Sequence, residues 1–438
     1  MTRDFYLSQA RFKRCVALVL SLLFCGTARL KADFTGSSHL VPLDEGAIQY
    51  SNGTTHGPIE KLQERIDNGT TRLKYEPQHG YLLSLLDQLK VLKSSQMLVF
   101  SKTSLQRELI SPKTPRALYF NDDVYVGFIP DAPLLEISVA DPKLGAVFYT
   151  LDQTRQDKPR LVRTNQCLEC HASSKSMGVP GHLVRSFTTN EIGMVDFRSG
   201  IDVVNHRTPL AERWGGWYVT GVHGKQSHLG NLVGEAAFKR QQKQPAPGGD
   251  VMNLVSRLDT SLYPLPHSDI VALMVLEHQT HFHNFLTRLN YEATLRIARY
   301  GEVKYLDSPT EAFLKYLLFT EEAPLTAPIS GSSNFAQQFS AQGPKDKQGR
   351  SLRDFDLKTR LFKYPCSFLI YSAAFDGLPS ALKEKIYRRL WEVLTGRDSG
   401  REFAKLSATD RRAILKILVD TKSDLPEYWK IENSTAAP

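Results

Sequence analysis

Two cysteines and a histidine stand together near the middle of the chain, in the pattern Cys-x-x-Cys-His. They are Cys167, Cys170 and His171, within the stretch LVRTNQCLECHASS. Two thiols at this spacing can each add to one vinyl group of the same haem, and the adjacent histidine is then placed to bind the iron. The pattern occurs once in the sequence. It predicts one covalently attached haem c, with His171 as the proximal iron ligand.

The same pattern also occurs in two other kinds of site, a redox dithiol and one half of a zinc site. A thioredoxin-like dithiol would open a helix after a strand in a β-α-β arrangement, which the surrounding sequence does not indicate. A four-ligand zinc site needs two further ligands, and Cys366 is the one other thiol outside residues 1–32. Cys366 itself is expected to be a buried small hydrophobic residue. Covalent haem is therefore the leading prediction.

Residues 1–32 have the features of an export signal. A basic segment ends at Arg14, an apolar run follows from Cys15 to Phe24, and small residues come next. We expect cleavage near residue 28 or residue 32, with lipidation of Cys25 or an uncleaved anchor as alternatives. No later segment is apolar for long enough to cross a bilayer, so no membrane span is expected in the mature chain. The protein is predicted to be periplasmic or otherwise exported.

The charge of the chain bears on its partners. The formal net charge is +9, which by itself would favour an acidic partner. Six basic residues and one acidic residue lie within residues 1–32, so the charge of the remainder falls to +4. Nucleic-acid binding is therefore not expected. At 438 residues, with 41% hydrophobic residues, the chain is long enough for two or three domains of ordinary globular composition.

Cys167, Cys170 and His171 match the motif of c-type cytochromes residue for residue. The chain resembles the large exported cytochrome-c-like proteins that carry a single haem, and the match rests on this motif. In the bacterial systems that it resembles, haem is attached on the outer side of the plasma membrane, so the export signal and the motif support each other. The resemblance implies electron transfer through haem and an unidentified redox partner protein. A peroxidase-like haem oxidoreductase with an open distal site is the alternative, and a haem-based sensor is a third.

The distal side of the iron needs its own ligand in an electron carrier. A small cytochrome c supplies a methionine there, and neither Met177 nor Met194 is well placed in the sequence for this role. His223 and His228 follow an expected strand in the same region as the motif. We therefore predict that one of these two histidines is the distal ligand, with a structural histidine as the alternative.

A second group of polar residues lies on a long helix expected from Ser268 to Tyr300. At 3.6 residues per turn, His278 and His281 share one face, Glu277 lies at its edge, and His283 points away. A hydrogen-bonded core network is one interpretation. The other makes this face the distal wall of a haem pocket, where Glu277, His278 or His281 would be the catalytic acid or base.

The pattern of the whole chain predicts an α+β fold, in which an antiparallel β-rich haem-binding domain precedes a mainly α-helical C-terminal domain. Short β-branched and aromatic runs between turn signals indicate an antiparallel meander, with further strands expected at 183–187 and 214–220. A Pro- and Gly-rich break at 241–250 separates the two parts. The expected regions are an N-terminal helical region over 33–110, the β-rich haem-binding domain over 111–240, and the helical domain over 251–432.

Overall fold

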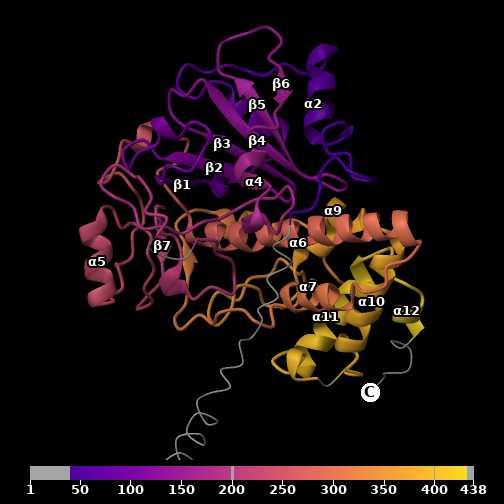
Figure 1. Cartoon of the computed structure of the whole chain (residues 1–438). Coiled ribbons are helices and arrows are strands. Elements are labelled where there is room, and N and C mark those ends of the chain that lie inside the picture. Colours follow the sequence, from indigo (N-terminus) through magenta and orange to yellow (C-terminus); the bar gives the residue numbers. More distant parts are fainter. Residues whose placement is uncertain (1–39, 199–201, 399, 432–438) are drawn as a thin grey trace, which may run out of the picture. The chain divides into compact units, whose positions relative to one another are not determined.

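The computed structural model describes residues 40–198, 202–398 and 400–431, all within the compact unit Gly36–Pro438. The expected signal peptide, residues 1–32, lies outside the described residues. The strands gather in the first half of the chain and most helices in the second, which confirms the α+β class (Figure 1). The domain boundaries expected at 110, 240 and 251 stay predictions.

A six-stranded antiparallel sheet forms the first layer, and its strands follow one another in sequence order. Each strand pairs with the next along the chain, which is the meander that the alternating runs predicted. The connections from β2 to β5 are short, whereas residues 100–115 join β1 to β2. The strands are β1 (Met97–Val99), β2 (Arg116–Phe120), β3 (Val124–Phe128), β4 (Leu134–Asp141), β5 (Gly145–Asp152) and β6 (Leu161–Arg163).

One face of this sheet is apolar and covered by helices. Helices α2 (Pro58–Asp67) and α3 (Leu82–Gln88) bury their leucines and isoleucines in one core with the side chains of that face, among them Tyr119, Val126 and Leu135. The side-chain period of two places the alternate residues of the same strands on the opposite face. There Tyr125 of β3 pairs with Ser138 of β4, which pairs with Phe148 of β5.

Helix α6 (Ile270–Tyr300) passes along one end of the sheet, between the sheet and the C-terminal helices (Figure 1). It begins where the Asp269 carboxylate accepts hydrogen bonds from the backbone of Val271 and Ala272, at 2.8 and 3.1 Å, and it ends at Gly301 in the left-handed conformation. Its side chains are buried over nearly the whole circumference as far as Tyr291. The helix expected from Ser268 to Tyr300 is thus confirmed.

The C-terminal helices pack on the other side of α6 and around one another. The Ser407 hydroxyl accepts a hydrogen bond from the Asp410 backbone at 3.0 Å and so caps the helix that follows it. These helices are α7 (Asp307–Leu317), α8 (Phe335–Ala341), α9 (Ala373–Asp376), α10 (Ser380–Leu394), α11 (Ala408–Thr421) and α12 (Tyr428–Ile431).

The remaining described elements are short. They are α4 (Leu168–His171), α5 (Glu235–Lys243), the two-stranded pair β7 (Gly221–Val222) and β8 (Ser330–Gly331), and 3-10 turns at Lys93–Ser95, Arg107–Leu109, Ser174–Ser176, Leu210–Glu212, Thr260–Leu262, Phe368–Tyr371 and Arg401–Phe403.

The strands expected at 183–187 and 214–220 are replaced by irregular segments with single bridges, such as Arg185 to Val203 and Val99 to Trp217. Trp214 and Gly216 adopt positive φ angles of 69° and 86°, which interrupt an extended strand. A Cβ on Gly215 would lie 2.4 Å from the Phe187 carbonyl oxygen, so the two segments cross in close contact. The aromatic residues that suggested a ladder serve core packing instead.

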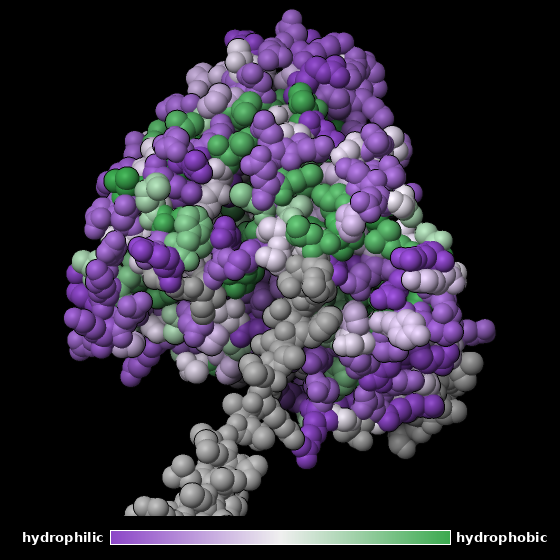
Figure 2. All heavy atoms as spheres, in the orientation of Figure 1, coloured by the Kyte–Doolittle hydropathy of each residue, from purple (hydrophilic) through white to green (hydrophobic). Residues whose placement is uncertain are grey.

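Across the described ranges, no helix combines the length and apolar character needed to cross a membrane. Although α6 has 31 residues, it carries Glu277, three histidines and several other polar side chains along its length. On the face drawn in Figure 2, hydrophobic residues lie in small patches among hydrophilic ones.

Candidate functional site

The Cys-x-x-Cys-His residues occupy a single helical turn, α4, beside the sheet. Cys167 caps the turn, and its carbonyl oxygen accepts hydrogen bonds from the backbone N–H of Cys170 at 3.3 Å and of His171 at 2.9 Å. Both thiols are free; Cys170 is exposed and Cys167 is partly buried. The turn therefore holds the three side chains together while leaving both sulfur atoms available for thioether bonds.

The imidazole of His171 is oriented by the backbone of the loop that follows. Its Nδ1 lies 2.8 Å from the carbonyl oxygen of Gly181. A carbonyl can only accept, so Nδ1 carries the proton and the Nε2 lone pair is left for another partner. Burial lowers the pKa of His171, which keeps the ring neutral. A neutral imidazole with a fixed tautomer is the form that ligates iron.

The same loop is held in place from α6. Asn284 accepts a hydrogen bond from the backbone N–H of His182 at 2.8 Å and donates one to its carbonyl at 2.8 Å. The approach is close, because a Cβ on Gly181 would lie 2.3 Å from Oδ1 of Asn284. The long helix thus positions the loop, and the loop positions His171.

A layer of rings lies between His171 and α6. The Phe148 ring packs 5.0 Å from that of His171, and the His182 ring lies 4.2 Å from that of Tyr125. Nε2 of His182 is 3.0 Å from the Ser138 hydroxyl, and the Tyr125 hydroxyl is 2.9 Å from Nδ1 of His283. Burial lowers the pKa of both histidines, that of His283 to about 3, so this layer is polar but uncharged at neutral pH.

The chemistry of the thiols separates the haem interpretation from the dithiol alternative. Burial raises the pKa of Cys167 to about 11, and the Glu136 carboxylate adds to the rise. A redox dithiol needs a lowered pKa, usually at the N-terminus of a long helix, whereas α4 has four residues. Among the residues that the structure describes, no three His, Cys, Asp or Glu side chains are grouped to hold a metal ion, so the zinc alternative gains no support. Cys366 is buried, as expected.

His223 and His228 lie together near β7, with ring centroids 4.6 Å apart. His223 contacts the carbonyl oxygens of Gln226 at 2.7 Å and Gly249 at 3.2 Å, and His228 packs against Trp214. Neither of the two described side chains makes a ring contact or a hydrogen bond with His171. The assignment of either one as distal ligand stays a prediction.

Glu277, His278 and His281 meet at a second buried cluster, on the side of α6 that faces α7. Glu277 accepts hydrogen bonds from Arg213 and from Nε1 of Trp214, the latter at 3.1 Å. The two ring nitrogens of His278 lie 2.8 Å from Nδ1 of His206 and 2.8 Å from the Ser367 hydroxyl.

The rings of His278 and His281 pack on Tyr316 of α7, at 5.3 and 4.8 Å. The bonds of Glu277 and His278 fit the hydrogen-bonded core network that is one interpretation of the sequence, whereas both ring nitrogens of His281 lack a hydrogen-bond partner among the described residues. The catalytic assignment of Glu277, His278 and His281 stays a prediction.

The α6 residues that contact the loop after the motif therefore include His283, Asn284 and Arg288, whose Nη1 donates to the Met177 carbonyl at 3.0 Å. The helical spacing in the sequence placed His283 away from the face that His278 and His281 share. Arg116 and Glu136 lie close to the motif as well, and no pattern in the sequence indicated them. A pairing of charged residues across strands could have indicated them, but it requires the register of the sheet.

No protein-family model, curated protein or solved structure matches the chain.

Proposed function

We propose that this protein is an exported c-type cytochrome that transfers electrons through one haem c. Cys167 and Cys170 would form the two thioether bonds, and His171 would bind the iron from the proximal side. The observation that carries the proposal is the His171 imidazole, oriented through Nδ1 by the Gly181 carbonyl at 2.8 Å beside two free thiols on the same turn. When bound, the haem supplies a one-electron couple between ferric and ferrous iron.

The residues of the chain bind and orient this group. The Gly181 carbonyl fixes the tautomer of His171, and Asn284 holds the loop that carries that carbonyl. Phe148 packs beside the imidazole and limits its rotation. Such outer contacts are what keep a ligating histidine in one orientation. The partner is inferred to be a soluble or membrane-associated redox protein outside the plasma membrane, reached through the exposed side of α4.

The experiment is haem staining of the denatured protein, together with the intact mass, after expression in a host that matures c-type cytochromes. The wild-type chain should retain one haem after denaturation, and Cys167→Ala with Cys170→Ala should abolish covalent retention. Cys366→Ala is the matched control, because Cys366 is the third free thiol of the described residues and lies in the core. Normal staining of the double variant would refute the proposal.

Whether the sixth coordination position of the iron is open or filled distinguishes the alternative functions. A peroxidase-like oxidoreductase would show a five-coordinate, high-spin spectrum and rapid reaction with peroxide, whereas a carrier would be six-coordinate and low-spin. A peroxidase-like function would use His278 or His281 as an acid or base at the iron. Both rings instead pack on Tyr316, on the α7 side of α6, and this favours the electron carrier. No described feature favours the sensor.

A further inference from the structure

An ion pair crosses the open face of the sheet beside the motif. Nη1 of Arg116 on β2 lies 2.8 Å from Oε2 of Glu136 on β4, and the two side chains are 18% and 16% exposed. The strand between them, β3, presents Gly127, whose register partners are Leu118 and Glu136. A Cβ on Gly127 would lie 3.5 Å from Glu136 and 3.6 Å from Arg116. A Cβ would therefore just contact both side chains, and the ion pair passes over β3 at a position with no side chain of its own.

The motif lies against the same face of the sheet. Glu136 pairs with Thr150, two residues along β5 from Phe148, and alternate residues of a strand share a face. Phe148 packs 5.0 Å from His171, so the ion pair and the His171 ring lie on one side of the sheet. Glu136 and Arg116 also act on the Cys167 thiol, raising and lowering its pKa respectively, after the larger effect of burial.

The pair is only partly neutralised by other groups. Glu136 accepts a hydrogen bond from Ser104 at 3.3 Å and one from Gln106 at 3.4 Å. On Arg116, the buried Nε has no hydrogen-bond partner among the described residues. A buried guanidinium nitrogen without an acceptor is costly, and it is a donor available to a group that comes to lie over this face.

We propose that the charges of Arg116 and Glu136, on the face of the sheet against which the motif lies, set the reduction potential of the haem attached at the motif. The inference rests on the proposed function and deepens it. Ferric iron carries one more positive charge than ferrous iron, so a nearby cation raises the potential and a nearby anion lowers it. In this weakly solvated position the two charges act in opposite directions on the same one-electron couple.

The test is the midpoint potential of the haem-loaded full-length protein, measured by spectroelectrochemistry. Arg116→Gln should lower the potential, Glu136→Gln should raise it, and the double variant should return towards the wild-type value. Arg116→Lys keeps the cation and should shift the potential less than Arg116→Gln. Shifts of opposite sign indicate an electrostatic role. A general disturbance of the fold would shift the midpoint potential in a direction that does not depend on which charge is removed.

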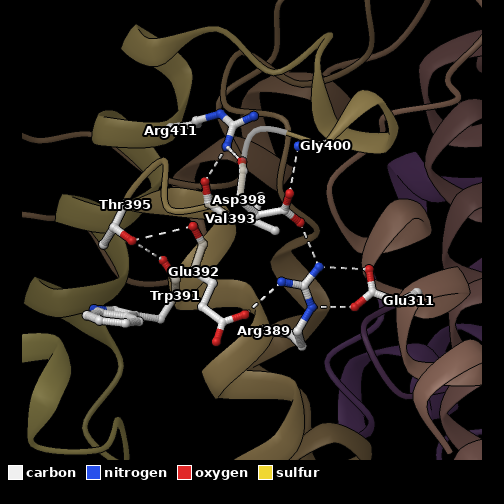
Figure 3. A network of polar contacts seen from close by, with 9 residues as sticks. All are labelled: Glu311, Arg389, Trp391, Glu392, Val393, Thr395, Asp398, Gly400 and Arg411. Carbon is white, nitrogen blue, oxygen red and sulfur yellow. Dashed lines mark hydrogen bonds and ion pairs between the residues drawn. The ribbon is translucent and has the colours of Figure 1, made fainter.

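Arg389→Gln is the matched control, since Arg389 is a half-buried arginine in an ion-pair network of another region. It lies between Glu311 of α7, Glu392 and Asp398, with an Nη2 to Oε2 distance of 3.0 Å to Glu311 (Figure 3). Its loss should leave the potential unchanged. A haem-loaded protein whose potential moves no more in Arg116→Gln and Glu136→Gln than in this control overturns the inference and leaves the proposed function standing. A wild-type chain without covalent haem overturns both.

Discussion

The two sides of α6 carry similar polar residues that are satisfied in different ways. On the sheet side, Asn284 makes two hydrogen bonds to the backbone of His182, and His283 bonds to Tyr125. On the α7 side, both ring nitrogens of His281 are buried without a hydrogen-bond partner in the described part of the chain. Buried polar groups are normally paired. On the sheet side, Nε2 of His283 and Nδ1 of His182 are also unpaired among the described residues, but each of these rings keeps one hydrogen bond through its other nitrogen. The two sides therefore differ in degree: hydrogen bonds anchor the rings on the sheet side, whereas His281 has ring contacts within the described part of the chain and no hydrogen bond.

The two sides of α6 also differ in the charge of their buried side chains. The α7 side holds the fully buried ion pair of Arg213 and Glu277, whereas His283 and Asn284 on the sheet side are uncharged, and the nearby pair of Arg288 and Glu292 is partly exposed. Burial raises the pKa of Glu277 to about 7, against the opposing effect of Arg213. We expect the two sides to respond differently to substitution and to pH, and the following changes test this.

The largest effect is expected for Arg213→Met. It would leave the Glu277 carboxylate buried without its cation, which typically costs about 3 to 5 kcal/mol. The loss should be measured as the free energy of urea unfolding at about pH 8, where Glu277 is charged, and it should be smaller at about pH 5, where the carboxyl is protonated. Arg360→Met is the control, because its pair with Asp410 is partly exposed and should contribute about 1 kcal/mol or less.

The sign of the pH effect follows from the raised pKa of Glu277. A carboxyl with a higher pKa in the folded state contributes stability below its unfolded value of 4.5, and this contribution is lost as the pH rises through about 7. The stability difference between Glu277→Gln and wild type should therefore change by about 3 kcal/mol across this range. The buried histidines act in the opposite direction, but they are common to both proteins. A difference that does not depend on pH would contradict the raised pKa.

Asn284→Leu should have the next largest effect. It removes both hydrogen bonds to the backbone of His182 and leaves a buried N–H and carbonyl unpaired, at a cost of about 2 to 3 kcal/mol. Because this loop carries the Gly181 carbonyl, the change should also loosen His171, which is checked by the yield of haem attachment. Asn290→Ala, on the same helix, loses hydrogen bonds to the β4–β5 turn and should destabilise the protein without reducing that yield. Equal yields in both variants would show that α6 does not position the loop.

The sequence was sufficient to predict those features that depend on residues close together in the chain. The Cys-x-x-Cys-His motif depends on residues that are neighbours in the sequence, the meander on alternating runs and turn residues, and the long helix on the helical periodicity between Ser268 and Tyr300. These predictions needed no knowledge of tertiary contacts.

The face of α6 that meets the motif could not be predicted in the same way. A helix buried over nearly its whole circumference has no single apolar stripe, so its pattern cannot show which neighbour lies on which side. The Arg116 and Glu136 pair depends on the register of three strands and on Gly127, and the crossing at Gly215 depends on a contact with Phe187. Such features arise from the packing of segments far apart in the chain.

A smaller effect is expected for Tyr125→Phe on the sheet side. The hydroxyl lies 2.9 Å from Nδ1 of His283 and accepts a hydrogen bond from Gln279 at 2.9 Å. Its removal leaves Nδ1 of His283 unpaired, while the Gln279 amide keeps its bond to the Asn121 carbonyl at 2.7 Å. The cost should be about 1 to 2 kcal/mol in the free energy of unfolding. Tyr316→Phe on the α7 side breaks one hydrogen bond, to the His278 carbonyl at 3.0 Å, and should cost about half as much. If Tyr316→Phe costs more, the sheet side is not the better-connected one.

The smallest effect is expected for His281→Leu. Burial lowers the pKa of His281 to about 3, so the ring is neutral, and its nitrogens have no hydrogen-bond partner among the described residues. Replacing it by an apolar residue of similar size loses no hydrogen bond and removes the cost of burying polar atoms, so stability should change by less than about 1 kcal/mol or increase. His283→Leu should be clearly destabilising, because it breaks the bond to Tyr125. The haem spectrum and peroxide reactivity of His281→Leu should match those of the wild type, because the ring packs on Tyr316 and Phe285. A changed spin state or a lost peroxide reaction in this stable variant would assign His281 to the haem site and favour the peroxidase-like function over the carrier.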